Sequence, residues 1–407
     1  MPLTGNWTLA ALSALTLAAL VATVLMWNRI RSWLRWPARA GLILGCQLTG
    51  VALVAALVND AGQFYGSWSE LFGHGTGVSL AVAAPGVQDR HVAEVIRREK
   101  RPGQSLIVPV YVPEAGGTKA DPALVYLPAA YFSSTYATAR FPVVELFEGF
   151  PASPRTWTLA LRLQQVLDTE INSHRAEPFV AVVPTQNYLG GLHDGECINA
   201  VHGPQVETTL TVNVQRVVER DFRVQRDRSG WAVLGYSTGG FCALNVGMRH
   251  PSMYSAAVSM SGNVQPYVDY TTGDIFGHSA AAEHSNDPLW RAQHLPGPPI
   301  SVLIAASRAD PGAWNGALTL GAALRAPTRT SLLMLPHGAQ SVTVWRVMEP
   351  VAFDWLSHIL AAPLADEVLA EGRSPVPDRD LLGVHHVRPP VIRAGRHRAE
   401  PARPKFQ

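Results

Sequence analysis

The amino-acid sequence predicts an α/β protein with a mostly parallel sheet, preceded by two transmembrane helices. Two observations support this fold class. Short apolar segments of strand length alternate with segments of helical spacing between about residues 105 and 360, which is typical of a parallel sheet covered on both faces. Near the N-terminus, two apolar runs without acidic or basic residues are close to the length that crosses a bilayer.

The first apolar run, residues 7–27, is long enough to span a membrane as a helix, and the second, residues 41–58, is slightly short and has Gln47 as its one strongly polar residue. The positive-inside rule places the loop between them in the cytoplasm, because it carries Arg29, Arg31, Arg35 and Arg39. A cleaved signal peptide is the alternative for the first run. A basic start and an obvious A-x-A cleavage site are missing, so two retained spans are favoured.

The chain is expected to have four parts: a transmembrane hairpin (1–58), a linker rich in Gly, Ser and aromatic residues (59–85), a globular α/β domain (86–362) and a disordered basic tail (363–407). Contact of the tail with anionic lipid or wall polymer is possible, but a solvated tail is the simpler interpretation. The formal net charge of +2 gives no indication of a nucleic-acid partner. This topology predicts a multi-pass protein of the cell membrane with an extracytoplasmic globular domain.

Eight segments of the globular domain have the apolar pattern of strands, namely 105–112, 123–127, 141–147, 178–183, 231–234, 254–259, 300–305 and 330–335. Helices are expected at 156–167, 241–250 and 344–360.

The strand at 231–234 leads into Gly235–Gly239 (GYSTG), which matches the G-x-S-x-G nucleophile elbow. A tight turn from strand to helix needs glycines around the serine, because side chains there would collide with neighbouring backbone. The turn would present the Ser237 hydroxyl near a helix N-terminus, where oriented N–H groups favour developing negative charge. A chance glycine-rich turn is the alternative, and the strand–turn–helix context favours the elbow.

From this elbow onward the sequence resembles the esterase D / mycolyltransferase-like family of α/β hydrolases, and within it the membrane-tethered esterases of actinobacteria. The resemblance runs from about residue 104 to 360 and rests on several blocks in the right order: 141–151 (FPVVELFEGFP), 196–199 (ECIN), 203–208 (GPQVET), 235–243 (GYSTGGFCA), 249–251 (RHP), 256–262 (AAVSMSG), 272–274 (TGD), 286–288 (NDP) and 307–311 (SRADP). The resemblance implies the α/β-hydrolase fold.

The resemblance also implies functional roles. Ser237 would be the nucleophile, and Asp310, on the loop after the 300–305 strand, would be the acid of a catalytic triad. A loop-capping aspartate is the alternative for Asp310. The backbone N–H groups of Thr238 and Phe150 would form the oxyanion hole. No cofactor or metal is implied.

Two positions depart from the family pattern. Glu148 stands where family members commonly have histidine, beside the expected oxyanion hole; Arg155 could pair with it, although a solvent-facing Glu148 is slightly favoured. Aligning the segment 336–345 (PHGAQSVTVW) with the family's last-strand motif places Gln340 at the position of the catalytic histidine. Glutamine cannot accept the proton of the serine. His337, three residues earlier, is the candidate substitute base, and a broken triad is the favoured alternative.

The sequence thus supports two functional hypotheses. The first is a membrane-anchored, extracytoplasmic serine esterase or acyltransferase that acts on acyl esters, including envelope lipids, with catalytic residues Ser237, Asp310 and His337. The second is a catalytically impaired pseudoenzyme of the same fold that binds lipid or glycan. Protein partners are not indicated.

Cys197 and Cys242 are expected to form a disulfide. Cys242 lies one turn into the helix after the nucleophile, and Cys197 lies on the loop after the 178–183 strand, which should run alongside. An exported domain meets oxidising conditions in which the bond persists. Two separate buried thiols are the alternative. Cys46 is expected to stay free in the second span.

The topology can be tested by cysteine labelling of intact cells. A cysteine at Ser374 should react with an impermeant maleimide, and one at Ser32 should be protected, because the arginine-rich loop is retained in the cytoplasm. The reverse pattern would contradict the extracytoplasmic placement of the globular domain.

Overall fold

The computed structural model describes residues 6–30, 35–62, 87–187 and 193–363. The linker expected up to residue 85 lies outside these ranges from residue 63 on, and so does the tail from residue 364 on. The two N-terminal segments form helices α1 (Asn6–Met26) and α2 (Arg35–Gly62), which are long and apolar enough to cross a membrane by length and composition.

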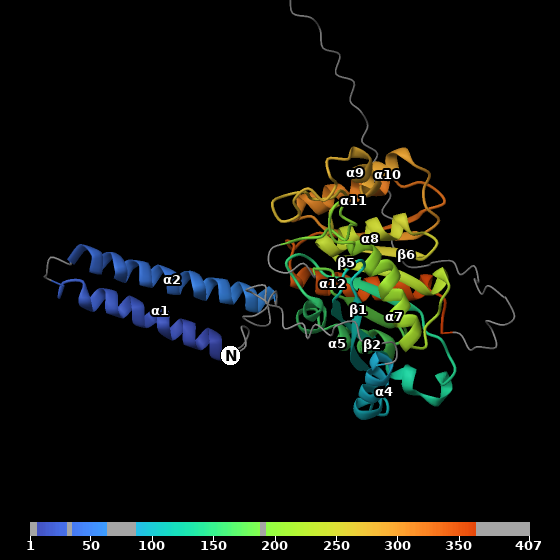
Figure 1. Cartoon of the computed structure of the whole chain (residues 1–407), viewed down its shortest axis with the longest axis horizontal. Coiled ribbons are helices and arrows are strands. Elements are labelled where there is room, and N and C mark those ends of the chain that lie inside the picture. The colour runs from blue at the N-terminus through green and yellow to red at the C-terminus, as the bar shows by residue number, and fades with distance from the viewer. Residues whose placement is uncertain (1–5, 31–34, 63–86, 188–192, 364–407) are drawn as a thin grey trace, which may run out of the picture. The chain divides into compact units, whose positions relative to one another are not determined.

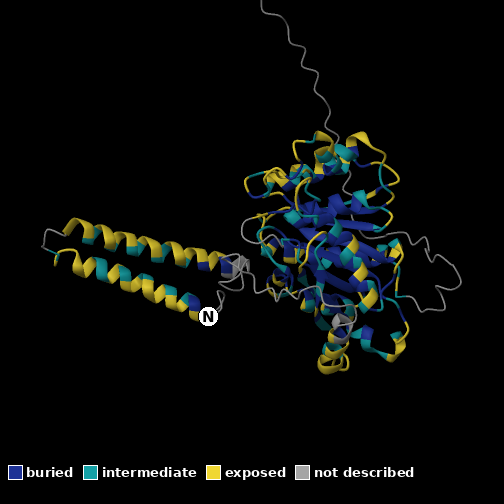
Figure 2. Ribbon diagram, in the orientation of Figure 1, coloured by how far each residue is buried: buried dark blue, intermediate teal, exposed yellow. Residues whose placement is uncertain are grey.

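Helices α1 and α2 run side by side as a hairpin (Figure 1). The hydroxyl of Thr23 donates to the carbonyl of Leu42 across the pair at 3.4 Å. At the connected ends, Arg39 donates to the carbonyl of Trp27 at 2.8 Å and lies over the Trp27 ring. Most residues along both helices are exposed (Figure 2), and most of the exposed residues are apolar.

The globular domain is built on an eight-stranded sheet of order β1-β2-β4-β3-β5-β6-β7-β8. Strands β1 and β2 pair antiparallel, as do β2 and β4, and all other neighbours are parallel. All eight strands expected from the sequence are present, with the bounds β1 Leu106–Pro113, β2 Ala120–Leu127, β3 Val143–Phe147, β4 Val180–Pro184, β5 Trp231–Tyr236, β6 Ala256–Met260, β7 Ser301–Ser307 and β8 Arg329–Leu335.

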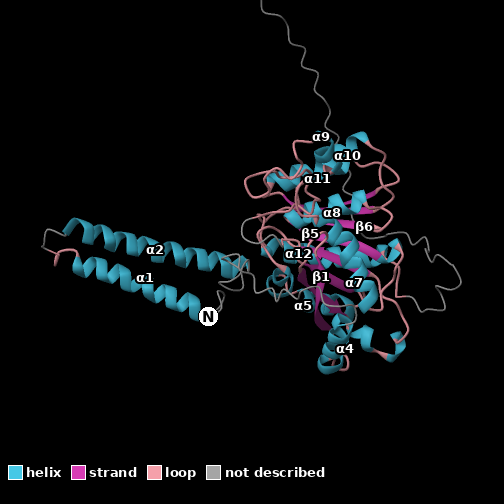
Figure 3. Ribbon diagram, viewed as in Figure 1, coloured by secondary structure: helices cyan, strands magenta, loops and turns pink. Residues whose placement is uncertain are grey.

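Helices cover both faces of this sheet (Figure 3). One face packs against residues from α4, α7, α8 and α11, and the other against α5 and α12. The helices of the domain are α4 Val87–Glu99, α5 Leu163–Asn172, α6 Val206–Thr208, α7 Val214–Asp221, α8 Thr238–Arg249, α9 Ala280–Ser285, α10 Pro288–His294, α11 Pro311–Ala323 and α12 Val342–Ile359, with short helical turns η1 Ala129–Phe132, η2 Ser134–Tyr136, η3 Thr156–Ala160, η4 Thr209–Asn213 and η5 Arg228–Gly230.

One expected helix is divided in two. The segment 156–167 forms the wide helical turn η3 and the start of α5, and Arg162 between them has a φ of +57°. A residue in the left-handed region interrupts an α-helix. The break lets Trp157 and Leu163, on either side of it, both enter the core on the α5–α12 face.

Helix α8, which follows Ser237 in the chain, is tied to the loop after β4 by a disulfide. Cys197 and Cys242 are bonded, with Cα atoms 5.5 Å apart, and both side chains are fully buried. Cys46, on α2, is free. The disulfide holds the irregular segment from residue 193 onward against α8.

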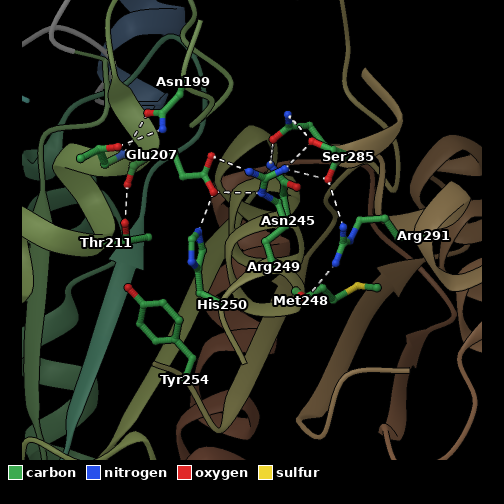
Figure 4. Close-up of polar contacts among 12 residues, drawn as sticks. Asn199, Glu207, Thr211, Asn245, Met248, Arg249, His250, Tyr254, Ser285 and Arg291 are labelled. Carbon is green, nitrogen blue, oxygen red and sulfur yellow. Dashed lines mark hydrogen bonds and ion pairs between the residues drawn. The ribbon is translucent and has the colours of Figure 1, made fainter. Parts of the chain in front are cut away.

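The far end of α8 is held by a polar network around Glu207 of α6 (Figure 4). The buried Glu207 carboxylate accepts hydrogen bonds from Arg249 at 2.9 and 3.2 Å and lies 2.6 Å from Nε2 of His250. Arg249 also donates to the carbonyl and hydroxyl of Ser285 at the end of α9. Burial raises the pKa of Glu207, but the bonds from His250 and Arg249 outweigh it, and the pKa lies below its ordinary value.

Removing the disulfide should destabilise the globular domain. The bond closes a loop of 45 residues, which in the chain-entropy model contributes roughly 3–4 kcal/mol. The double variant Cys197→Ala/Cys242→Ala should lose about this much free energy of unfolding in urea titrations, and Cys46→Ala should lose none. Equal effects of both variants would contradict a specific role of this bond.

Glu207 should make stability depend on pH. Because its folded pKa is below the unfolded value, its contribution is present above the unfolded pKa and is lost as pH falls through the folded pKa. Glu207→Gln should cost about 3 kcal/mol near pH 7, since it leaves the guanidinium of Arg249 without its counter-charge. The difference in free energy of unfolding between the two proteins should shrink on acidification below pH 4. A difference that stays constant from pH 7 to pH 3 would contradict this assignment.

Candidate functional site

The turn between β5 and α8 has the geometry of a nucleophile elbow. Ser237 adopts φ +55° and ψ −126°, a conformation that non-glycine residues rarely adopt. A Cβ on Gly235 would lie 2.0 Å from the carbonyl oxygen of Gly239, and a Cβ on Gly239 would lie 2.3 Å from the carbonyl oxygen of Phe147. Both glycines are therefore required by the close approach of β5, α8 and β3, as the motif predicts.

The side chain that contacts the Ser237 hydroxyl is Gln340. Its Nε2 donates to Oγ of Ser237 at 2.8 Å and lies 3.5 Å from the carbonyl oxygen of Ser261. Two acceptors around one amide nitrogen support this orientation of the amide group. Ser237 thus accepts a hydrogen bond from a group that cannot remove its proton at neutral pH.

His337 lies elsewhere on the same loop. Its side chain is exposed, and within the described part of the chain no hydrogen bond joins it to Ser237 or Asp310. The next residue, Gly338, has a φ of +98°, and its carbonyl accepts from the hydroxyl of Ser307. Because the chain turns at Gly338, the side chains of His337 and Gln340 lie in different places. Gln340 contacts the serine, and His337 is exposed.

Asp310 lies on the loop after β7, at the edge of the sheet where the elbow also lies. It is the N-cap of α11, and its Oδ1 accepts from the backbone N–H of Ala313 at 3.2 Å. Asp310 therefore caps a helix, which is the alternative role that the sequence leaves open. A histidine contact of Asp310 is not found among the described residues.

Of the two expected oxyanion donors, Thr238 follows the serine in the chain and Phe150 lies on the loop after β3, which approaches the elbow at Gly149. Thr238 is the first residue of α8, so its N–H has no acceptor within the helix. Phe150 follows Gly149, which packs against the elbow: a Cβ on Gly149 would lie 3.1 Å from Cβ of Ser237. This arrangement is compatible with a carbonyl oxygen held between two backbone donors.

Glu148 is fully buried, so the expectation of a solvent-facing side chain is wrong. Its Oε1 accepts from the backbone N–H of Gln186 at 3.2 Å, and its Oε2 has no hydrogen-bond partner among the residues that the structure describes. Arg155 is exposed. Burial raises the pKa of Glu148 well above its ordinary value, which favours the uncharged acid. A neutral Glu148 removes the electrostatic objection to an oxyanion forming nearby.

The sequence analysis missed Asp194, which contacts the residue after the nucleophile. Asp194 is 5% exposed, accepts from the backbone N–H of Glu196 at 2.9 Å and is hydrogen-bonded by the side chain of Thr238. Burial raises its pKa to about 6. No motif marks this position, because it becomes relevant only through the packing of its loop on α8.

A cavity of about 210 Å³ lies beside Asp194. Its lining is part polar and part apolar and includes His193, Asp194, Ile198, Thr271, Asp274 and Ile275. The Cys197–Cys242 bond anchors the loop that forms one wall of this cavity to α8. In the described ranges, no group of three or more His, Cys, Asp or Glu side chains is placed to hold a metal ion.

Two solved structures are similar to this chain in fold. A ferulic acid esterase superposes with a TM-score of 0.55 at 18% identity, over 63% of this chain and 99% of that one. An S-formylglutathione hydrolase from Agrobacterium tumefaciens gives a TM-score of 0.52 at 15% identity, over 65% and 98% of the two chains. At these identities the likeness shows the α/β-hydrolase fold.

Sequence comparison gives the family. An uncharacterized protein of Corynebacterium glutamicum is 26% identical over 342 residues, which cover 77% of this chain and 76% of that one. The family model described as "Putative esterase" matches residues 121–340, from β2 to the loop that carries Gln340. Because this match covers more than half of the chain and includes the elbow, the protein belongs to the Esterase family of α/β hydrolases.

Proposed function

We propose that the protein binds an acyl ester at Ser237 and turns it over slowly, as a serine esterase or acyltransferase of the Esterase family. The observation that carries this proposal is the 2.8 Å hydrogen bond from Gln340 to Ser237. The elbow supports binding and attack, because it presents a serine at the N-terminus of α8. The amide of Gln340 supports slow turnover, because it is not a base.

In the proposed reaction, Oγ of Ser237 attacks the carbonyl carbon of the ester, and the backbone N–H groups of Thr238 and Phe150 stabilise the negative oxygen that forms. The hydroxyl proton must then pass to water or to the leaving alcohol, because no side-chain base contacts Ser237 among the described residues. Enzymes that lose a triad member keep roughly 10³–10⁴-fold catalysis over water from the remaining site.

The hydrogen bond to Gln340 also supports a second candidate function. If the proton transfer is too slow to matter, the site around Ser237 binds an ester, lipid or glycan without turning it over, and the protein is a pseudoenzyme. The two functions share this site and differ in turnover, so a rate measurement separates them.

His337 is proposed as the base only in a rearranged loop. The turn at Gly338 and the exposure of residues 336, 337, 339 and 340 support such a rearrangement, because few packing contacts oppose it. In that arrangement His337 would replace Gln340 beside Ser237, and Asp310 would orient the imidazole.

The anchor belongs to the same proposal. Helices α1 and α2 would insert as a transmembrane hairpin, with the arginine-rich connection in the cytoplasm and the globular domain outside the cell. A site held near the outer membrane surface would meet esters of envelope lipids.

Substitution of Gln340 tests the proposed role of this residue. Gln340→His should raise the turnover of a short p-nitrophenyl ester by roughly 10²-fold or more, since a positioned general base contributes about this much. Ser237→Ala should abolish the activity of the natural protein and of the Gln340→His variant. His337→Ala should leave the activity of the natural protein unchanged. Mapping a fluorophosphonate adduct to Ser237 in each protein would confirm the nucleophile.

Three other outcomes have defined meanings. High activity of the natural protein that is lost in His337→Ala would establish the rearranged loop. High activity that survives His337→Ala would mean that another group accepts the proton. No activity and no adduct in any variant, with tight binding of a lipid ester, would establish the pseudoenzyme.

A further inference from the structure

The two edges of the sheet differ in their capacity to bind another strand. At one edge, β1 contains Pro109 and Pro113, which have no N–H group to donate. At the other edge, β8 has no proline in its seven residues and a single charged residue, Arg329, at its start. Natural sheets commonly protect exposed edges with proline, charge or a covering element. All seven residues of β8 are at least partly exposed, whereas all of neighbouring β7 is buried.

The backbone groups of β8 that point away from β7 can be assigned from the pairing. The N–H of Arg329 donates to Ile300 at 3.0 Å, and the carbonyl of Leu335 accepts from Arg308 at 2.9 Å. In a parallel pair, both polar groups of one residue point to the same side, and the side alternates along the strand. Residues 329, 331, 333 and 335 therefore pair with β7, and Thr330, Leu332 and Met334 direct their N–H and C=O groups outward. These outward groups have no acceptor or donor among the described residues.

Apolar side chains flank this open edge. Leu332 is 38% exposed and packs over Gly321 of α11. A Cβ added to Gly321 would lie 3.2 Å from the Leu332 side chain. Leu318, one turn before Gly321 on α11, is 43% exposed. Exposed leucines next to unpaired backbone groups offer both apolar contact and hydrogen bonds to an added strand.

We propose that two copies of the chain associate through β8, paired antiparallel about a twofold axis at Leu332. The spacing of the outward residues is self-complementary: Leu332 would oppose Leu332 of the second copy, and Thr330 would oppose Met334 of that copy at both ends. Each opposed pair exchanges two backbone hydrogen bonds. The twofold operation gives the same contacts to both copies, as in most soluble homodimers.

Charge favours this orientation. In the antiparallel arrangement the two copies of Arg329 lie at opposite ends of the pair, about 20 Å apart at the rise of a β-strand. A parallel arrangement would place them side by side, where like charges repel.

The interface also bears on the proposed site, because β8 leads directly into the loop that carries His337 and Gln340.

The oligomeric state of the full chain in detergent tests the proposal. Multi-angle light scattering should give a dimer for the natural protein and a monomer for Leu332→Lys, because the lysine places a charge at the centre of the pair. Leu332→Pro should act in the same way, since it removes an N–H that β7 does not use. The matched control is Leu159→Lys, at a leucine of η3 that is 55% exposed, and it should stay dimeric. Circular dichroism should show that all variants are folded.

A cross-link locates the contact. In a Cys46→Ser background, Leu332→Cys should form a covalent dimer with a short bismaleimide, whereas Leu159→Cys should not. A monomeric natural protein would overturn the proposal. A dimer that persists in both Leu332→Lys and Leu332→Pro, without cross-linking at residue 332, would also overturn it and would assign the association to another surface, such as the helical hairpin.

Discussion

The site depends on the backbone conformation of Ser237. A non-glycine residue held at φ +55° and ψ −126° costs of order 1–3 kcal/mol, and such a conformation persists only where its surroundings determine it. Here Ser237 follows β5, and the neighbouring strands β6 and β3 hold the turn. The N–H of Ser237 donates to the carbonyl of Met260 in β6 at 2.9 Å, and Gly239 packs against the carbonyl of Phe147 at the end of β3. The central strands of the sheet thereby aim the hydroxyl out of the carboxyl edge.

Because the conformation of Ser237 depends on its surroundings, the position of α8 matters, and α8 is held by contacts along its whole length. Asp194 contacts Thr238 in its first turn, Cys197 is bonded to Cys242 in its second turn, and Glu207 binds Arg249 at its last residue. All three partners lie between β4 and α7 in the chain. The sequence blocks at 196–199 and 203–208, which carry part of the family resemblance, therefore help to hold α8, the helix that follows Ser237.

The charge of the side chains near Ser237 bears on whether the site can accept a proton. The amide of Gln340 donates to the Ser237 hydroxyl, and the two positions that depart from the family pattern hold a buried carboxyl group and a neutral amide. Burial raises the pKa of Glu148 well above its ordinary value, which favours the uncharged acid, and the amide of Gln340 carries no charge. Burial also raises the pKa of Asp194, which contacts Thr238, to about 6. The side chain seen in contact with Ser237 is therefore an amide, which cannot accept the hydroxyl proton.

The eight strands and the elbow could be predicted from the sequence, because each depends on local signals: apolar runs of strand length, and glycines beside a serine. The Cys197–Cys242 pair, 45 residues apart, was predicted from the expected order of the elements. Which side chains reach the serine depends on the tertiary structure. Gln340 is 103 residues away from Ser237 in the chain, and the turn at Gly338 directs it inward while His337 faces solvent. The burial of Glu148 and the contact of Asp194 with Thr238 likewise follow from how loops pack at the sheet edge. No sequence period encodes that packing, since it depends on the elements that meet there.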